Sequence, residues 1–176
     1  MEEKIWYELV QVKFGETYLA QYISLQQYLR RTFKILTLVL SSSGALGWAI
    51  WKPIAGIACG IIAVMQVLSM IENLLFRTEE EIQKVCDLRT MYIKYLNKIE
   101  QLWVAYSNGD LSESDASKAF FKLRNKEWVQ IEQLDNTLNI KHYKKLEEKA
   151  DRLTNQYITT YHSTNGKAVT KPEIVC

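Results

Sequence analysis

Residues 35–51 (ILTLVLSSSGALGWAIW) and 54–71 (IAGIACGIIAVMQVLSMI) are two uncharged apolar runs, separated only by Lys52 and Pro53. At a rise of about 1.5 Å per residue, each run makes a helix of roughly 26 Å, close to the ~30 Å hydrocarbon core of a bilayer. A helix on the surface of a soluble protein carries a regular polar face, and neither run has one. The runs therefore predict a two-helix transmembrane hairpin over residues 35–76.

Two other interpretations of the runs are open. The first run begins behind a long polar segment and a second run follows it, which argues against a cleaved signal peptide. A buried hairpin within a soluble helical bundle would need amphipathic partners on every side. The mean hydropathy of −0.17 does not distinguish a membrane protein from a soluble one, because it averages two apolar runs with long charge-rich segments. The net charge of +2 gives no reason to expect nucleic acid from global charge alone.

Residues 1–34 are predicted to form a long amphipathic helix that Gly15 interrupts or kinks. Its apolar positions recur at helical spacing: Ile5, Leu9, Val12, Leu19, Tyr22, Ile23 and Leu29. Basic residues flank the two ends that adjoin the polar parts of the chain: Arg30, Arg31, Lys34, Arg77, Lys84 and Arg89. The positive-inside rule then places both termini in the cytoplasm of a multi-pass protein of the inner membrane.

Residues 77–162 are predicted to form a cytoplasmic helical coiled-coil bundle. The second span is expected to run without a stop into a polar helix that ends near Tyr106, before an Asn-Gly turn. That helix carries a heptad-like stripe: Ile82, Val85, Leu88, Tyr92, Tyr95, Ile99, Leu102 and Tyr106. Ser112 is the expected N-cap of the next helix.

That next helix is expected to end near Leu134, with a break at residues 135–137. A last helix over about 141–161 should carry a stripe of Leu146, Ala150, Leu153, Tyr157 and Tyr161. The tail, residues 163–176, is expected to be disordered. No segment predicts a strand, so the fold class is all-α.

The sequence shows no set of residues that predicts catalysis. It has no GxSxG, HExxH, phosphate-loop or dinucleotide-binding motif, and no spacing of cysteines and histidines typical of a metal site. We therefore expect a protein that is not an enzyme and has no cofactor or metal. Glu79, Glu80 and Glu81 are interpreted as a solvated helix face rather than an acid–base pair.

Small residues occur at spacings of three or four residues within the two runs. They let helix backbones approach closely in lipid, where packing drives association. The members are Ser43, Gly47, Gly56, Gly60 and Ala63. They serve either the packing of the two spans or contacts between subunits. Because two helices enclose no lumen, transport through this hairpin would require a homo-oligomer such as a tetramer.

Polar residues mark one side of the second run. Gln66, Ser69 and Asn73 share that side, and Glu72 lies near its inner boundary. Polar groups are costly against lipid, so these residues are candidates for lining a pore. Interhelical hydrogen bonding in a static bundle is the alternative.

Two basic stripes are candidates for binding an anionic ligand, either phosphates of a nucleotide or oligonucleotide or anionic lipid headgroups. One comprises Lys118, Lys122 and Lys126, and the other Lys141, Lys144, Lys145, Lys149 and Arg152. Interleaved acidic residues leave a solvated, salt-bridged face as the alternative.

The layout resembles the SLATT class of small two-transmembrane bacterial effectors. The segments that carry the resemblance are YLRRTFKILTLVLSSSGALGWAIW (28–51), KPIAGIACGIIAVMQVLSMIENLL (52–75) and the polar helix that follows. The resemblance implies an effector of anti-phage defence that forms a pore or perturbs the membrane beside an enzyme or sensor that controls it. The Hailong type is similar, with a membrane effector held silent by short DNA oligomers.

The hairpin and the small-residue spacing thus predict a homo-oligomeric membrane protein that opens a conduit. The resemblance implies in addition that it is a defence effector under a nucleotide or oligonucleotide signal from a neighbouring nucleotidyltransferase. A membrane-anchored helical scaffold or adaptor is the main alternative, and a soluble helical regulator is another.

Overall fold

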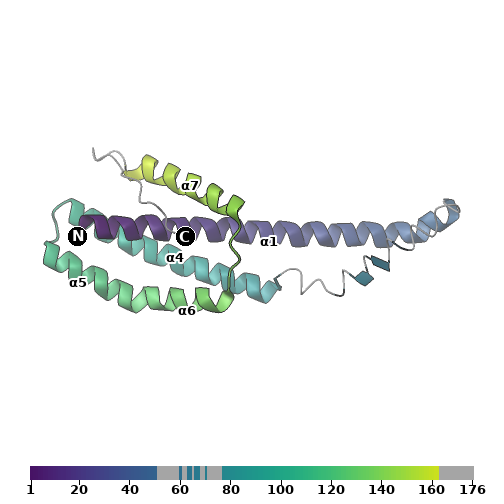
Figure 1. Ribbon diagram of the computed structural model, residues 1–176, viewed down its shortest axis with the longest axis horizontal. Helices are drawn as coiled ribbons and strands as arrows, with labels where there is room; N and C mark the ends of the chain where they lie inside the picture. The colour runs from purple at the N-terminus through teal and green to yellow at the C-terminus, as the bar shows by residue number, and fades with distance from the viewer. Residues whose placement is uncertain (51–59, 61–62, 65, 68–69, 71–76, 163–176) are drawn as a thin grey trace. The chain divides into compact units, whose positions relative to one another are not determined.

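The computed structural model describes residues 1–50, 60, 63–64, 66–67, 70 and 77–162, with the backbone alone for residues 40–50. Every regular element in these residues is a helix, which confirms the all-α prediction for this part of the chain (Figure 1). Two compact units are present: Met1–Tyr22 with Gln83–Cys176, and Ile23–Ile82. We call the first the bundle unit and the second the apolar unit.

No helix among the described residues combines the length and the apolarity needed to cross a membrane. The turn predicted at Lys52-Pro53, most of the second apolar run and the tail at 163–176 lie outside the described residues.

Helix α1 spans Glu2–Ile50 without a break. The prediction that Gly15 interrupts or kinks this segment is wrong, because the helix continues through it. A Cβ atom at Gly15 would lie 2.5 Å from Cε1 of Tyr92, so this glycine lets the Tyr92 ring pack against the α1 backbone. The residue meets a packing requirement rather than a conformational one.

Helix α4 begins at Glu79 and ends at Ser107. Arg77 and Thr78 are not helical, so the expected uninterrupted helix from the second run into α4 is wrong. Thr78 and Glu81 form a capping box: the Thr78 hydroxyl accepts from the Glu81 amide at 3.2 Å, and the Glu81 carboxylate accepts from the Thr78 amide at 2.9 Å. The acidic run is therefore the start of a helix.

The core of the bundle unit lies where α1 and α4 pack antiparallel, since Glu8 pairs with Tyr95 and Glu16 with Arg89. Most of the predicted stripes are buried here, with the ends of the α4 stripe half-buried. Their buried members are Ile5, Leu9, Val12, Leu19, Tyr22, Val85, Leu88, Tyr92, Tyr95, Ile99 and Leu102. The heptad-like spacing thus identified the seam correctly.

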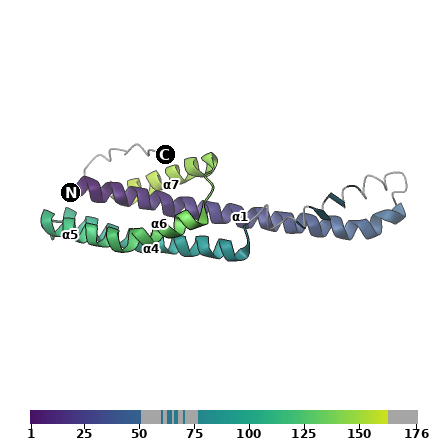
Figure 2. The same cartoon turned by 60° about the horizontal axis from the view of Figure 1, so that its bottom comes forward.

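A continuous helical stretch follows the turn at Gly109. It consists of α5 (Glu113–Leu123), the π-helix η2 (Arg124–Trp128) and α6 (Val129–Leu138), and it runs beside α4 (Figures 1 and 2). Ser112 is the N-cap, as predicted, and accepts from the Asp115 amide at 3.2 Å. The break predicted at residues 135–137 is wrong, because α6 continues to Leu138 and Asn139 ends it in the left-handed conformation.

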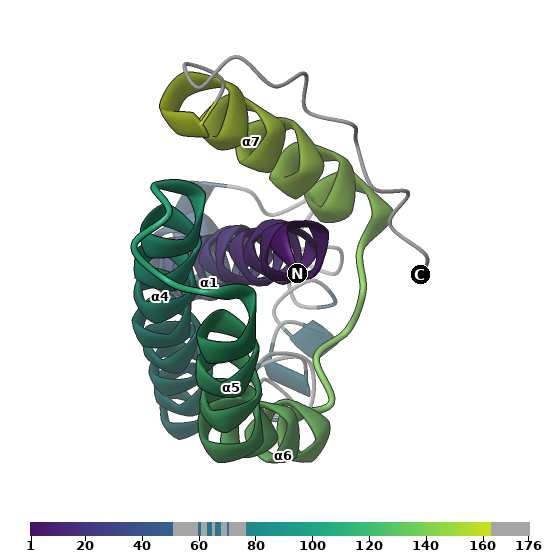
Figure 3. The same cartoon turned by 90° about the vertical axis from the view of Figure 1, so that its left-hand side faces the viewer.

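Helix α7 (Lys144–His162) covers the other side of α1, so that α1 lies between α7 and the α5–α6 stretch (Figure 3). Its buried residues are Ala150, Thr154, Ile158 and His162. The predicted stripe is therefore rotated, and Tyr161 is 67% exposed. The buried residues are spaced by four and include the polar Thr154 and His162, in place of the expected apolar heptad.

Replacing Gly15 with alanine should destabilise the protein by about 1–3 kcal/mol, because the new methyl group overpacks against the Tyr92 ring. Helix propensity alone predicts the opposite sign, since alanine is favoured over glycine by about 1 kcal/mol within a helix. Urea unfolding followed by circular dichroism measures the difference.

The control is the same substitution in a Tyr92→Ala background, where the ring is gone. There Gly15→Ala should be neutral or stabilising. Equal destabilisation in both backgrounds would show that the ring is not the cause.

Candidate functional site

The predicted small-residue and pore-lining positions are described only in part. Gly60, Ala63 and Gln66 are helical and exposed. Ser43 and Gly47 lie on the α1 backbone, without described side chains, and Gly56, Ser69, Glu72 and Asn73 lie outside the described residues. A Cβ atom at Gly60 would meet nothing within 4 Å. Within the described chain, this glycine therefore has room on its face.

The two basic stripes are fully exposed and lie apart. Lys118 and Lys122 are on α5 and Lys126 is on η2, whereas Lys144, Lys145, Lys149 and Arg152 are on α7 and Lys141 precedes it. Helix α1 lies between α7 and α5, so the stripes do not merge into one basic surface (Figure 3). Lys118 Nζ lies 3.8 Å from Asp115 Oδ1 with both side chains exposed, and an ion pair of this kind is weak.

Two carboxylates of α1 are buried in the bundle unit and paired there. The Arg89 guanidinium donates to Glu16 Oε1 at 2.7 and 2.9 Å, and Lys13 donates to Oε2 at 2.9 Å. Burial by itself would raise the pKa of Glu16, but the hydrogen bonds and charges of Lys13 and Arg89 outweigh it, so the pKa lies below its ordinary value. Charge pairing thus keeps this carboxylate ionised.

Glu8 is the second buried carboxylate. The Tyr95 hydroxyl donates to its Oε1 at 2.9 Å, and Arg124 Nη1 lies 3.7 Å from its Oε2. Burial, and then the charge of Glu8, raise the pKa of Tyr95, so the phenol stays protonated and can donate. Arg124 is the first residue of the π-helix η2, so its contact with Glu8 joins η2 to α1.

A third polar cluster attaches the end of α7. Tyr157 donates to Glu100 Oε1 at 2.7 Å, and His162 Nε2 lies 3.0 Å from the same oxygen. The indole rings of Trp6 and Trp103 lie 5.5 and 5.1 Å from the buried imidazole ring. Because these partners come from α1, α4 and α7, the cluster holds three helices together.

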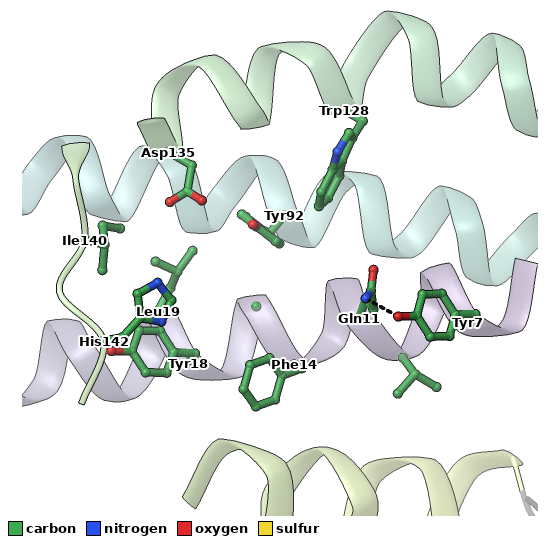
Figure 4. A pocket seen from close by; sticks show the side chains of 12 residues that line it. Tyr7, Gln11, Phe14, Tyr18, Leu19, Tyr92, Trp128, Asp135, Ile140 and His142 are labelled. Atoms are coloured by element: carbon green, nitrogen blue, oxygen red, sulfur yellow. Dashed lines mark hydrogen bonds between the residues drawn. The ribbon is translucent and has the colours of Figure 1, made fainter. Parts of the chain in front are cut away.

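A cavity of about 220 Å³ opens in the bundle unit between α1, α4 and the α6 end of the helical stretch (Figure 4). Aromatic side chains dominate its wall, with two ionisable groups, Asp135 and His142. The lining residues are Tyr7, Val10, Gln11, Phe14, Gly15, Tyr18, Leu19, Tyr92, Trp128, Asp135, Ile140 and His142. None of these is a lysine or an arginine, so the cavity is separate in chemistry from the basic stripes.

Asp135 is the unusual group in this wall. Its carboxylate forms no hydrogen bond or ion pair with any residue that the structure describes. Burial raises its pKa, and the charge that His142 carries when protonated opposes the rise. Figure 4 shows Asp135 pointing from α6 toward the space above α1, beside the Tyr92 ring. A half-buried acceptor therefore faces the cavity without a partner.

Local backbone features shape the cavity. The π-helix ends at Trp128, whose ring packs 5.8 Å from Tyr92 and 5.5 Å from Tyr95. Gly15 admits the Tyr92 ring from the opposite side. Trp128, the last residue of η2, therefore contributes its indole ring to the wall beside Tyr92.

The loop before α7 closes one end. The Tyr18 hydroxyl donates to the Lys141 carbonyl at 2.7 Å and accepts from the Tyr143 amide at 3.1 Å. His142 stacks on Tyr18 with ring centroids 5.7 Å apart, and its Nδ1 lies 3.0 Å from Glu147 Oε1. These contacts hold His142 at the rim.

The sequence predicts neither this cavity nor a ligand-binding role for Asp135, Trp128 or His142. From the sequence, Asp135 is expected in a helix break. The only sequence signal was the density of aromatic residues in the first half of α1, which marks packing as readily as binding. Among the described residues no group of histidine, cysteine and acidic side chains is placed to hold a metal ion.

Comparison of the chain with protein-family models, curated proteins and solved structures found no match.

Replacing Glu16 with glutamine should cost about 2 kcal/mol of stability at pH 7, the range for buried hydrogen bonds to charged groups. Because the pKa of Glu16 is lowered on folding, its contribution is complete above the ordinary value of 4.5 and is lost as pH falls through the folded pKa. Chemical denaturation at several pH values measures the difference.

The matched control is Glu148→Gln, which makes the same change at an exposed position of α7. It should leave stability unchanged within about 0.5 kcal/mol. A Glu16→Gln deficit that stays constant down to strongly acidic pH would contradict the role of the ion pairs.

Proposed function

We propose that this chain is a homo-oligomeric effector of the bacterial inner membrane that forms or gates a pore. Opening would depolarise the cell or arrest its growth in anti-phage defence. A nucleotide or short oligonucleotide from a neighbouring nucleotidyltransferase would control it from the cytoplasmic side. The resemblance to the SLATT class motivates this role, and the apolar unit supports its membrane part.

The observation that carries the proposal is the exposure of large apolar side chains in the apolar unit. Side chains more than half exposed there are Ile35, Leu36, Leu38, Val39, Val64, Val67 and Met70. Met70 is 86% exposed. Large apolar side chains exposed in this number within one unit favour a membrane or protein contact, because water disfavours them. In the proposed effector, lipid and neighbouring subunits would cover these side chains.

Charged residues at the edge of the apolar unit fit a membrane boundary. Arg30 Nη1 lies 3.2 Å from Glu79 Oε1, and Lys34 Nζ lies 3.8 Å from the same oxygen. These pairs connect the residues that precede the first run with the start of α4. Basic residues at such a boundary favour the cytoplasmic side.

The open face at Gly60 supports assembly. The sequence left two roles for the small residues, packing within the hairpin or contacts between subunits. Gly60 has no described atom near its Cβ position, so contact within the described chain does not account for the glycine. A close helix–helix contact with another subunit would account for it, since small residues favour such contacts in lipid.

Helix α1 supplies the proposed coupling. It belongs to the bundle unit through Met1–Tyr22 and continues as helix into the first apolar run. A ligand that shifted α1 within the bundle would act on the same helix that enters the membrane. Two arrangements of the bundle, one stabilised by the signal, are all that such a switch requires.

Gly60→Leu should change the oligomeric mass in lipid nanodiscs and reduce ion flux in vesicles and toxicity in cells, because the larger side chain separates the helix backbones. Native mass spectrometry and a vesicle flux assay measure these quantities. Ala58→Leu is the matched control. In the helix that the sequence predicts over residues 54–71, two residues correspond to about half a turn, so the added bulk is expected on the opposite face.

A wild-type protein that stays monomeric in lipid and passes no ions with or without signal would refute the pore. An adaptor would instead retain function when residues 35–76 are replaced by an unrelated apolar hairpin, whereas a pore would lose it.

The separation of the basic stripes makes the ligand contact testable. Because α1 lies between them, a short oligonucleotide bound to α7 should lose affinity on reversal of Lys145 and Lys149 to glutamate and not on reversal of Lys118 and Lys122. Fluorescence anisotropy at two salt concentrations measures this. Equal losses for both pairs would indicate non-specific attraction by net charge.

A further inference from the structure

The structure assigns to the cavity of the bundle unit a binding site for a small organic cation, an ammonium or amidinium group on a single apolar or aromatic body. This site is independent of the proposed pore and of the anionic signal. It rests on the size of the cavity, its aromatic wall and the position of the Asp135 carboxylate.

The volume sets the size of the ligand. Sites for drug-sized ligands usually occupy roughly 300–1,000 Å³. The cavity here measures about 220 Å³, which suits one ring or a short alkyl chain rather than a complete nucleotide. The absence of lysine and arginine from its wall also disfavours a phosphate group.

The wall sets the sign of the charge. Aromatic faces carry negative electrostatic potential and attract cations, the more so where water is excluded. Tyr7, Phe14, Tyr18, Tyr92 and Trp128 supply such rings from three sides. A neutral apolar ligand would also fit these rings, so the aromatic wall alone does not select a cation.

The Asp135 carboxylate favours a cation over a neutral ligand. Burial removes part of the water around the Asp135 carboxylate and raises its pKa, and a bound cation that donates N–H groups would compensate for that loss of hydration. Glu132 and Asp135 both act on the Tyr92 hydroxyl, so this end of the cavity is negative. The nearest cation of the chain itself, His142 when protonated, is engaged by Glu147 at the rim. The carboxylate is thus available to a ligand.

The first test uses the unmodified full-length chain in detergent and three probes of similar shape: benzylammonium, benzyl alcohol and benzoate. Isothermal titration calorimetry should show binding of benzylammonium and at least about tenfold weaker binding of benzyl alcohol, the worth of one charge-assisted hydrogen bond. Benzoate should not bind detectably. Equal affinity for the cation and the alcohol, or binding of benzoate, would overturn the proposal.

The second test locates the site. In ¹⁵N-labelled protein the indole N–H resonance of Trp128, assigned through Trp128→Phe, should shift on titration with benzylammonium, while that of Trp103 in the α7 cluster should not. A shift confined to Trp103, or none at either indole, would place any binding elsewhere and refute the assignment.

Asp135→Asn should abolish the preference for the cation over the alcohol, because the amide keeps the shape and loses the charge. Asp110→Asn makes the same change at an exposed position outside the cavity and should retain the preference. The melting temperature of each variant shows whether it is folded. If Asp135→Asn is unfolded, the relative affinities of the three probes for the unmodified protein test the proposal. An Asp135→Asn protein that is folded and still prefers benzylammonium would contradict the role of the carboxylate.

Discussion

The pairing of two buried carboxylates on α1 is the constraint on which the bundle depends. An ionised carboxylate removed from water is destabilising unless charges and donors compensate it. Glu16 obtains Lys13 from its own helix and Arg89 from α4, and Glu8 obtains Tyr95 from α4 and Arg124 from η2. These pairs occur only in one register of α1 against its neighbours. An apolar stripe alone would tolerate a shift by one turn, whereas the buried charges would then lose their partners.

The same contacts extend to the α5–α6 stretch. Arg124 lies beside Glu8, and Trp128 packs against Tyr92 and Tyr95. These two residues are the first and the last of the π-helix, so the irregular turn occurs where the stretch makes both contacts. Trp128 also contributes its indole ring to the wall of the cavity.

The bundle unit keeps two kinds of surface chemistry apart. Exposed lysines lie on α5 and on α7, on opposite sides of α1, whereas the cavity presents aromatic rings and a carboxylate. The proposed anionic signal and the proposed organic cation would therefore bind at different places. The large apolar side chains that are more than half exposed belong to the apolar unit.

Local and periodic features were within reach of the sequence. Helical periodicity identified the all-α class and the α1–α4 seam, because a stripe of apolar residues must face a partner to leave water. Ser112 was identified as a cap because it bonds the backbone three residues away. Thr78 and Glu81 carried an equally local signal that was overlooked, since the apolar run before them favoured one long helix.

Other features depend on residues far apart in the chain, and only the tertiary structure decided them. Gly15 is required by a ring that enters from α4. The polar members of the α7 stripe, Thr154 and His162, are buried because the surrounding helices enclose them. Asp135 lines a cavity only because η2, α1 and the loop before α7 meet there. Packing and desolvation act between segments that the sequence order does not bring together. The membrane prediction for the two apolar runs rests on consecutive residues alone and stays a prediction.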